Sequence, residues 1–203
     1  TSVTGDANSI SKYMRNCQDM GIEVLPPDVN ESDKKFSVVD GKIRFGLSGV
    51  KNVGDGVIDA IIEAREKKGI PTDIFRFIEN LDIHKINKKA IESLIRAGAL
   101  DCFDPNRAAH IGIYESLIES AQSSAKKNIE GQLSLFQLAA DTMEESNVVN
   151  RLPAVKNFEK EVLLAQEKEM LGVYLTDHPL REFEDQIKQM TTVTAQDLAD
   201  VMD

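Results

Sequence analysis

The chain has 203 residues, a formal net charge of -10 and a hydrophobic content of 41%. This length allows one or two domains with a sizeable core, and the composition is that of a globular protein rather than a disordered one. No apolar run approaches the ~20 residues that cross a bilayer, and the N-terminus has no signal-peptide pattern, so we expect no membrane attachment. The chain opens in a polar stretch without Met, which indicates a piece of a longer protein.

The few residues with metal-binding or redox chemistry are scattered. Cys17 and Cys102 lie far apart, which favours a reducing, cytoplasmic setting and gives no metal site. The three histidines, His84, His110 and His178, add none, and surface or partly buried positions explain them. We predict no metal and no cofactor.

Acidic residues are unevenly distributed along the chain. Residues 1–97 hold equal numbers of acidic and basic side chains, so the whole acid excess lies in residues 98–203. A net negative charge opposes general electrostatic attraction to nucleic acid. Any contact with nucleic acid should therefore be local, in the neutral first half, and made by backbone amides and a few Lys or Arg side chains.

The apolar spacing predicts a mainly α-helical protein. Aromatic residues make up only 5% of the chain and Trp is absent, so aliphatic side chains must fill the core, which suits packed helices. Apolar residues three and four apart predict helices over residues 7–20, 55–67, 73–79, 87–96, 106–121, 157–171 and 180–188, with a last turn or two over 195–202. A β-hairpin is predicted over residues 36–45, turning at Asp40-Gly41. Apolar residues no longer recur at helical spacing over residues 122–155, which predicts a linker or an exposed arm.

Residues 47–54, here called the first hairpin, stand before the helix predicted from Asp55 and resemble a helix-hairpin-helix element. A tight glycine turn lets the backbone approach a DNA phosphate, and the next helix aims its free N–H groups at that phosphate. Such contacts hold DNA without reading its sequence. Asn52 replaces the motif's first glycine, and we expect it to tolerate the left-handed conformation of the turn. Asp55 is a plausible N-cap, but its carboxylate would repel a phosphate unless it faces away.

Residues 94–100, the second hairpin, form a fainter copy that turns at Gly98 and leads to residues 106–107. Two such units in tandem could bridge a duplex groove, one on each strand. The alternative is that each glycine turn only connects two amphipathic helices, since a solvated Lys or Arg needs no further explanation. The candidate DNA-binding residues are Gly49, Lys51, Asn52, Val53, Gly54, Arg96, Gly98 and Arg107.

The predicted arm contains large apolar residues, and exposed apolar residues in a polar segment indicate a binding site for a partner protein. The pentapeptide Gln132, Leu133, Ser134, Leu135 and Phe136 resembles the bacterial sliding-clamp binding motif. In that family the Leu and Phe enter an apolar pocket on the clamp and the Gln amide makes hydrogen bonds at its edge. The alternative is an amphipathic helix that continues to residue 140 with Leu133 and Phe136 on the core.

Three blocks of sequence identify a wider resemblance. Residues 21–32, residues 45–65 with the first hairpin, and residues 167–180 closely resemble segments of the bacterial DNA polymerase III alpha subunit, a C-family replicative polymerase. The blocks keep the family's order and spacing, and the pentapeptide falls where that family carries its internal clamp motif. The resemblance covers nearly the whole chain.

The resemblance implies a domain assignment. Residues 1–45 look like the end of the fingers region with its β-hairpin, and residues 46–121 like a tandem helix-hairpin-helix domain that holds duplex DNA. Residues 122–156 form the arm with the clamp motif, and residues 157–203 a helical connector toward an absent OB domain. The expected partners are double-stranded DNA, the sliding clamp (beta subunit) and, through the parent chain, other subunits of the polymerase III holoenzyme.

The family is a DNA-directed DNA polymerase, a nucleotidyltransferase whose palm holds divalent metals with an Asp-x-Asp pair. This sequence contains no Asp-x-Asp, so we expect no catalytic residue and no polymerase activity from the segment itself. Its expected role is to hold duplex DNA and tether the polymerase to the clamp for processive replication. The competing function is a helical interaction scaffold that does not bind DNA, and the salt dependence of duplex binding separates the two.

Overall fold

The computed structural model describes residues 7–129, 151–183 and 186. This part of the chain contains six α-helices and one three-stranded sheet. The elements in chain order are α1 Ala7–Asp19, β1 Val24–Leu25, β2 Ser37–Val39, β3 Lys42–Arg44, η1 Leu47–Gly49, α2 Asp55–Lys68, α3 Ile74–Asn80, α4 Lys88–Arg96, α5 Arg107–Ile129, α7 Lys160–Leu171 and η2 Arg181–Phe183. The predicted fold class, mainly α with a small β-hairpin, is confirmed.

The predicted β-hairpin forms between β2 and β3. Asp40 has φ 50° and Gly41 φ 77°, the positive angles that a two-residue turn between right-twisted strands requires. Ser37 pairs with Arg44, which sets the antiparallel register. The two residues of β1 add a parallel strand on the far side of β3, and the sequence analysis named no strand there.

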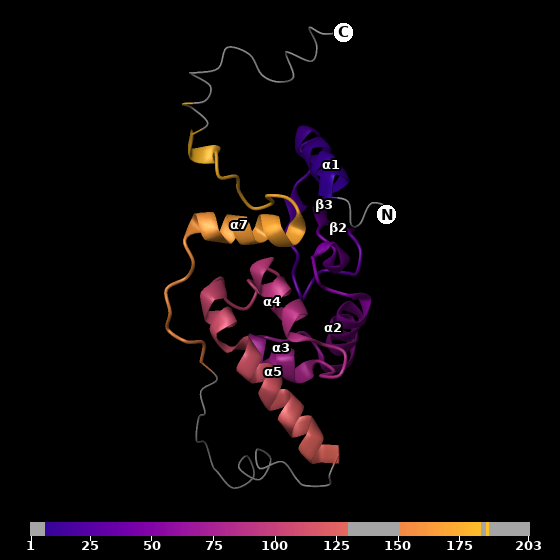
Figure 1. Ribbon diagram of the computed structural model, residues 1–203. Coiled ribbons are helices and arrows are strands. Elements are labelled where there is room, and N and C mark those ends of the chain that lie inside the picture. The colour runs from indigo at the N-terminus through magenta and orange to yellow at the C-terminus, as the bar shows by residue number, and fades with distance from the viewer. Residues whose placement is uncertain (1–6, 130–150, 184–185, 187–203) are drawn as a thin grey trace.

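Helices α2 to α5 form the body of the molecule (Figure 1). The Asp73 carboxylate accepts from the Arg76 N–H at 2.8 Å, and the Asn87 amide oxygen accepts from the Ala90 N–H at 2.8 Å. These caps fix the starts of α3 and α4 where the sequence predicted them. The core that the helices share is mainly aliphatic, and its largest fully buried members include Phe45, Leu47, Ile58, Ile61, Ile74, Ile78, Ile91, Leu94, Ile95, Leu100 and Ile118.

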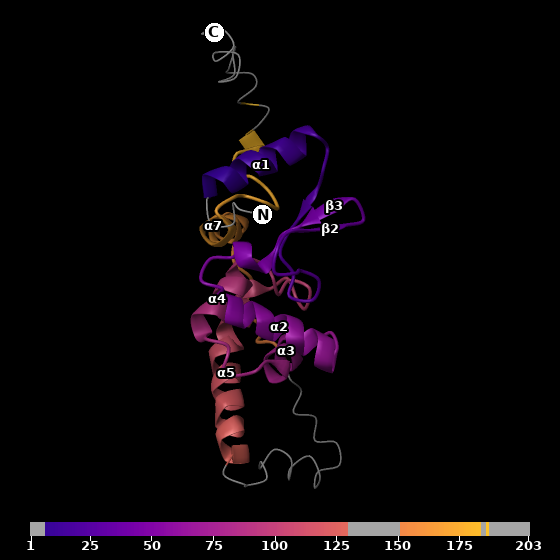
Figure 2. The ribbon, with the colours of Figure 1, turned by 90° about the vertical axis from the view of Figure 1, so that its right-hand side faces the viewer.

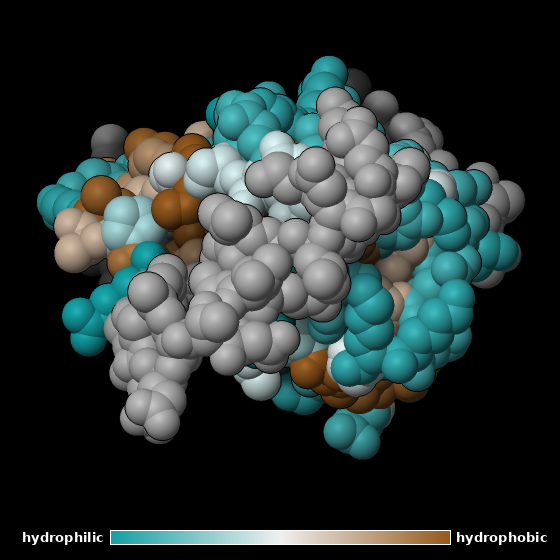
Figure 3. Space-filling model, turned by 90° about the horizontal axis from the view of Figure 1, so that it is seen from below, coloured by the Kyte–Doolittle hydropathy of each residue, from teal (hydrophilic) through white to brown (hydrophobic). Residues whose placement is uncertain are grey.

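Helix α5 is longer than predicted. It continues to Ile129, whereas the apolar spacing fades at residue 121. The last turns of α5 project away from the body (Figure 1 and Figure 2), so they have no core to face and need no apolar stripe. Seen from below, hydrophilic residues cover much of the described surface, with apolar residues showing in smaller areas (Figure 3).

Helix α7 returns to the body and lies between α1 and α4 (Figure 1). Its buried residues are Leu164, Glu167, Met170 and Leu171, and the last two join the core cluster that contains α4. The helix begins three residues later than predicted, after an extended segment, and ends at Gly172 with φ 79°. Of the helix predicted over residues 180–188, the structure describes η2 at Arg181–Phe183, and residues 184–185 and 187–203 lie outside the described residues.

No helix among the described residues combines the length and the apolar character needed to cross a membrane. Within the same residues, no group of three or more His, Cys, Asp or Glu side chains is placed to hold a metal ion. Both Cys17 and Cys102 are free thiols. Partial burial of its thiol raises the pKa of Cys102 to about 12, so this thiol is protonated at neutral pH.

Candidate nucleic-acid interface

The first hairpin turns at Asn52, which has φ 64°. The expectation that Asn52 takes the left-handed conformation of the missing glycine is therefore confirmed. Its amide Nδ2 also donates to Ser93 Oγ at 3.1 Å, which fastens the turn to α4. The side chain of Asn52 remains exposed, so the turn lies at the surface of the molecule.

The N-terminus of α2, directly after this turn, is open. Gly54 is the N-cap residue with φ -82° and makes no side-chain cap. A Cβ atom placed on Gly54 or on Gly56 would meet no atom within 4 Å. The first N–H groups of an α-helix have no partner within the helix, and here no side chain covers them. The exposed Lys51 lies in the same turn, so this end of α2 offers free amides, a positive dipole end and a cation from the turn itself.

Two other residues of the first hairpin face the protein interior. A Cβ atom on Gly49 would lie 2.4 Å from the Phe45 ring, so this glycine allows close packing of the aromatic ring. Val53 is 8% exposed and belongs to the core. Both residues pack against the core and support the turn from its buried side.

Helix α7 contacts the first hairpin from the side. The Lys51 N–H donates to the Met170 carbonyl at 2.9 Å, so one amide of the turn is already satisfied within the protein. Arg96 lies nearby, with Nη2 at 2.7 Å from Glu92 and Nη1 at 3.7 Å from Glu169. These two carboxylates offset the charge of Arg96, which therefore attracts a phosphate less than Lys51 does.

The second hairpin is built around a buried arginine. Gly98 has φ 79°, and a Cβ atom there would lie 2.2 Å from Arg107 Nη2. Arg107 is 6% exposed, its Nη2 donates to Asp101 at 2.7 Å, and its Nη1 donates to the Arg96 carbonyl at 3.2 Å. Burial raises the pKa of Asp101 even though the charge of Arg107 lowers it. The structure thus uses Arg107 and Gly98 to hold this turn together.

The N-terminus of α5 is closed by the chain itself. Asn106 Nδ2 donates to the Val155 carbonyl at 2.7 Å, and Asn157 Nδ2 donates to the Pro105 carbonyl at 2.9 Å. Asn157 Oδ1 also accepts from the Ala108 N–H at 3.4 Å, which satisfies one amide of the first turn. The two hairpins therefore differ, because α2 presents open amides and α5 does not.

Lys34 is a residue near the first hairpin that the sequence analysis missed. Its Nζ lies 3.3 Å from Asp55 Oδ1, at the open end of α2. The Lys34-Lys35 doublet was the signal available in the sequence, but it lies outside the hairpin motif. Only the folded chain brings Lys34 beside residue 55.

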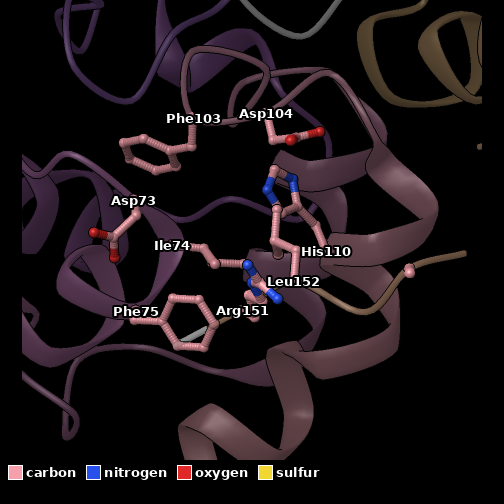
Figure 4. Close-up of a pocket in the computed structure, with 9 residues that line it drawn as sticks. Asp73, Ile74, Phe75, Phe103, Asp104, His110, Arg151 and Leu152 are labelled. Atoms are coloured by element: carbon pink, nitrogen blue, oxygen red, sulfur yellow. The ribbon is translucent and has the colours of Figure 1, made fainter. Parts of the chain in front are cut away.

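A cavity of about 500 Å³ lies on another part of the body, between α3, the start of α5 and residues 151–154 (Figure 4). His110 is fully buried in its wall, and neither ring nitrogen has a partner among the described protein atoms. Burial lowers the pKa of His110, against the charges of Asp104 and Asp101, so the imidazole is neutral at pH 7. The lining also holds two acidic side chains, Asp73 and Asp104, and one cation, Arg151, but no residue of either hairpin, so this cavity is separate from the candidate interface.

The pentapeptide at residues 132–136, predicted to bind a sliding clamp, lies outside the described residues. The structure describes the segments on either side. Helix α5 leads to it, and the segment from residue 151 returns along the start of α5, where Pro153 lies 3.5 Å from a Cβ placed on Gly112. Both ends of the intervening chain are thus attached to the same helical body.

The chain is similar to known proteins over nearly its whole length. Residues 21–110 match a family described as the helix-hairpin-helix motif. A protein of Chlamydia pneumoniae named DNA polymerase III subunit alpha is 39% identical over 197 residues, 96% of this chain and 16% of that protein. The proteins of the same name from Vibrio cholerae and Haemophilus influenzae are 38% and 34% identical over 95% and 98% of this chain, and 17% of each is covered. The chain spans about a sixth of the length of these curated relatives.

Proposed function

Because the chain is homologous to one segment of the bacterial DNA polymerase III alpha subunits, we propose that it holds duplex DNA and tethers its polymerase to the sliding clamp during processive replication. Homology and the helix-hairpin-helix match support a DNA-binding polymerase segment. The polymerase reaction then belongs to the rest of the parent chain, and this segment contributes no catalytic residue. Its setting is the cytoplasm, beside the other subunits of the holoenzyme.

The open N-terminus of α2 is the observation that carries the DNA-holding role. A phosphate placed there meets the unpaired amides of residues 54–56, the positive end of the helix dipole and the Lys51 ammonium. Gly54 and Gly56 leave room for the DNA backbone to approach. Contacts of this kind bind any sequence, because they reach the phosphates and not the bases.

The candidate residues take different roles in this proposal. Lys51, Asn52 and Gly54 face the phosphate, while Gly49 and Val53 support the turn from the core. In the second hairpin, Gly98 and Arg107 keep the helices α4 and α5 in place, and Arg96 stays bound to its two carboxylates. We therefore assign the direct phosphate contact to the first hairpin.

The clamp tether rests on the pentapeptide at residues 132–136. Two large apolar anchors in a short peptide provide micromolar affinity when they enter a pocket on the partner. Calorimetric titration of purified sliding clamp into the chain tests this role, beside a double variant Leu135→Ala, Phe136→Ala and a control Gln122→Ala on the exposed face of α5. Binding by the unaltered chain and the control that disappears in the double variant supports the tether, and no binding by the unaltered chain rejects it.

The DNA-holding role is tested by anisotropy of a labelled duplex over a range of salt concentrations. We expect the logarithm of the affinity to fall linearly with the logarithm of salt, by about 0.9 per phosphate neutralised. Two duplexes of unrelated sequence should bind equally. A helical interaction scaffold, the competing function, would bind neither duplex at low salt.

A further inference from the structure

Asp55 presents an apparent obstacle to phosphate binding at the first hairpin. It is the first residue of α2, and its side chain is 74% exposed at the open end of the helix. A carboxylate favours this helix end in the absence of DNA, but it repels a phosphate that approaches the same amides. A DNA site here needs a nearby cation that offsets this charge.

Lys34 supplies such a cation. Its Nζ lies 3.3 Å from Asp55 Oδ1 and 3.4 Å from Asp59 Oδ1, so it bridges two carboxylates that stand one helical turn apart. Partial burial alone would lower the pKa of Lys34, but hydrogen bonds and attraction from the two aspartates outweigh it and raise the pKa above its ordinary value. Lys34 is therefore charged wherever DNA binding would be measured.

The position of Lys34 is fixed by backbone contacts. The Leu47 N–H donates to the Asp33 carbonyl and the Ser48 N–H to the Lys34 carbonyl, each at 3.0 Å. A Cβ atom on Gly46 would lie 2.4 Å from the Lys35 carbonyl carbon, so only glycine allows the two chain segments to approach this closely. The loop that carries Lys34 is thus attached to η1, the element that begins the first hairpin.

A second anchor comes from α2 itself. Arg65 Nη2 donates to the Ser32 carbonyl at 2.9 Å, and Ser32 Oγ donates to the Phe45 carbonyl at 2.8 Å. Ser32 is fully buried. Arg65, in the last turn of α2, thus holds Ser32, and Asp55, the first residue of α2, contacts Lys34. Residues 32–34 therefore lie along α2, although they precede the hairpin motif in the sequence.

We propose that Lys34 is a positioning residue of the DNA site, which screens the Asp55 carboxylate so that a phosphate can bind the open N-terminus of α2. The inference rests on the proposed DNA-holding function. Lys34 acts through Asp55 and does not need to touch DNA. Its loss should therefore matter only while residue 55 carries a negative charge.

The test measures duplex affinity for Lys34→Gln, Asp55→Asn and the double variant of the full 203-residue chain, at one fixed salt concentration. Lys35→Gln is the matched control, because it removes the same charge from the exposed neighbouring lysine. We expect Lys34→Gln to weaken binding roughly fivefold and the double variant to bind at least as well as the unaltered chain. Lys35→Gln should lose clearly less. Thermal unfolding of each variant shows that the fold is retained.

Two results would overturn the inference while the unaltered chain still binds DNA. Equal affinities for Lys34→Gln and Lys35→Gln would show that Lys34 acts only as a general surface charge. A loss that persists in the Asp55→Asn background would show that Lys34 contacts DNA without regard to Asp55. Absence of duplex binding by the unaltered chain would instead reject the DNA-holding function on which the inference rests.

Discussion

The Lys51 N–H and the Met170 carbonyl lie 2.9 Å apart and form a hydrogen bond between the first hairpin and the end of α7. More than 100 positions separate the two residues in the chain. The bond makes α7 part of the structure that supports the turn. Mutations in α7 should therefore affect DNA binding through the support of the turn.

Replacing Leu171, which is 2% exposed, tests this link. We expect Leu171→Ala to lower the free energy of unfolding by about 2–4 kcal/mol, because it leaves a cavity in the core that α7 shares with α4. Duplex affinity should also fall, since the turn loses its support. Val162→Ala is the control on the same helix, because Val162 is 43% exposed. Urea unfolding and anisotropy measure both effects, and equal behaviour of the two variants would contradict the role of α7.

Gly54→Ala should separate DNA binding from stability. The φ angle of Gly54 suits any residue, and a Cβ atom there meets nothing within 4 Å, so the melting temperature should hardly change. The added methyl group lies where the DNA backbone would approach, so duplex affinity should fall several-fold. Unchanged affinity in this variant would mean that the phosphate does not reach the N-terminus of α2.

Gly98→Ala should have the opposite effect. The positive φ of 79° disfavours alanine, and the new Cβ atom would lie 2.2 Å from Arg107 Nη2. We expect a loss of roughly 2–4 kcal/mol in the free energy of unfolding, from backbone strain and displacement of the arginine. At a temperature where the variant is still folded, its duplex affinity should match that of the unaltered chain. A stable variant with weakened DNA binding would reassign the phosphate contact to the second hairpin.

His110 should make the chain sensitive to mild acid. Burial lowers its pKa in the folded state, whereas the unfolded imidazole takes up a proton near its ordinary value of 6.5. As the pH falls through about 6.5, the unfolded state binds more protons and the free energy of unfolding decreases, until the folded imidazole also titrates. Urea unfolding at pH 7.5 and 5.5 measures the difference.

The His110→Leu variant should lose most of this decrease, and His84→Gln, at an exposed position, should keep it. An equal decrease in His110→Leu and in the unaltered chain would contradict the assignment, and would point to the carboxylates instead.

Local signals in the sequence predicted local structure well. Asp40-Gly41 predicted the β-turn because its positive φ angles suit few other dipeptides. The apolar spacing predicted where α3 and α4 begin, and the structure shows that the Asp73 and Asn87 side chains cap those first turns. The extension of α5 was missed because a helix that leaves the body carries no apolar stripe.

The candidate site was harder to predict, because distant parts of the chain form it. The motif located the turn at Asn52 and Gly54, yet nothing in the sequence placed Lys34 or Met170 beside it. The pattern also gave both hairpins the same role. They differ because residue 157 caps the start of α5, a contact between positions far apart in the chain.

The most direct test of DNA binding at the open end of α2 compares charge reversals at two exposed lysines, one at each end of this helix. Lys51→Glu alters the first hairpin, and Lys67→Glu alters the opposite end of α2, where the side chain is 72% exposed. Anisotropy of a labelled duplex at physiological salt should show a loss of roughly tenfold or more for Lys51→Glu and little change for Lys67→Glu. Equal losses in both variants, or none in either, would contradict the claim that the open end of α2 holds DNA.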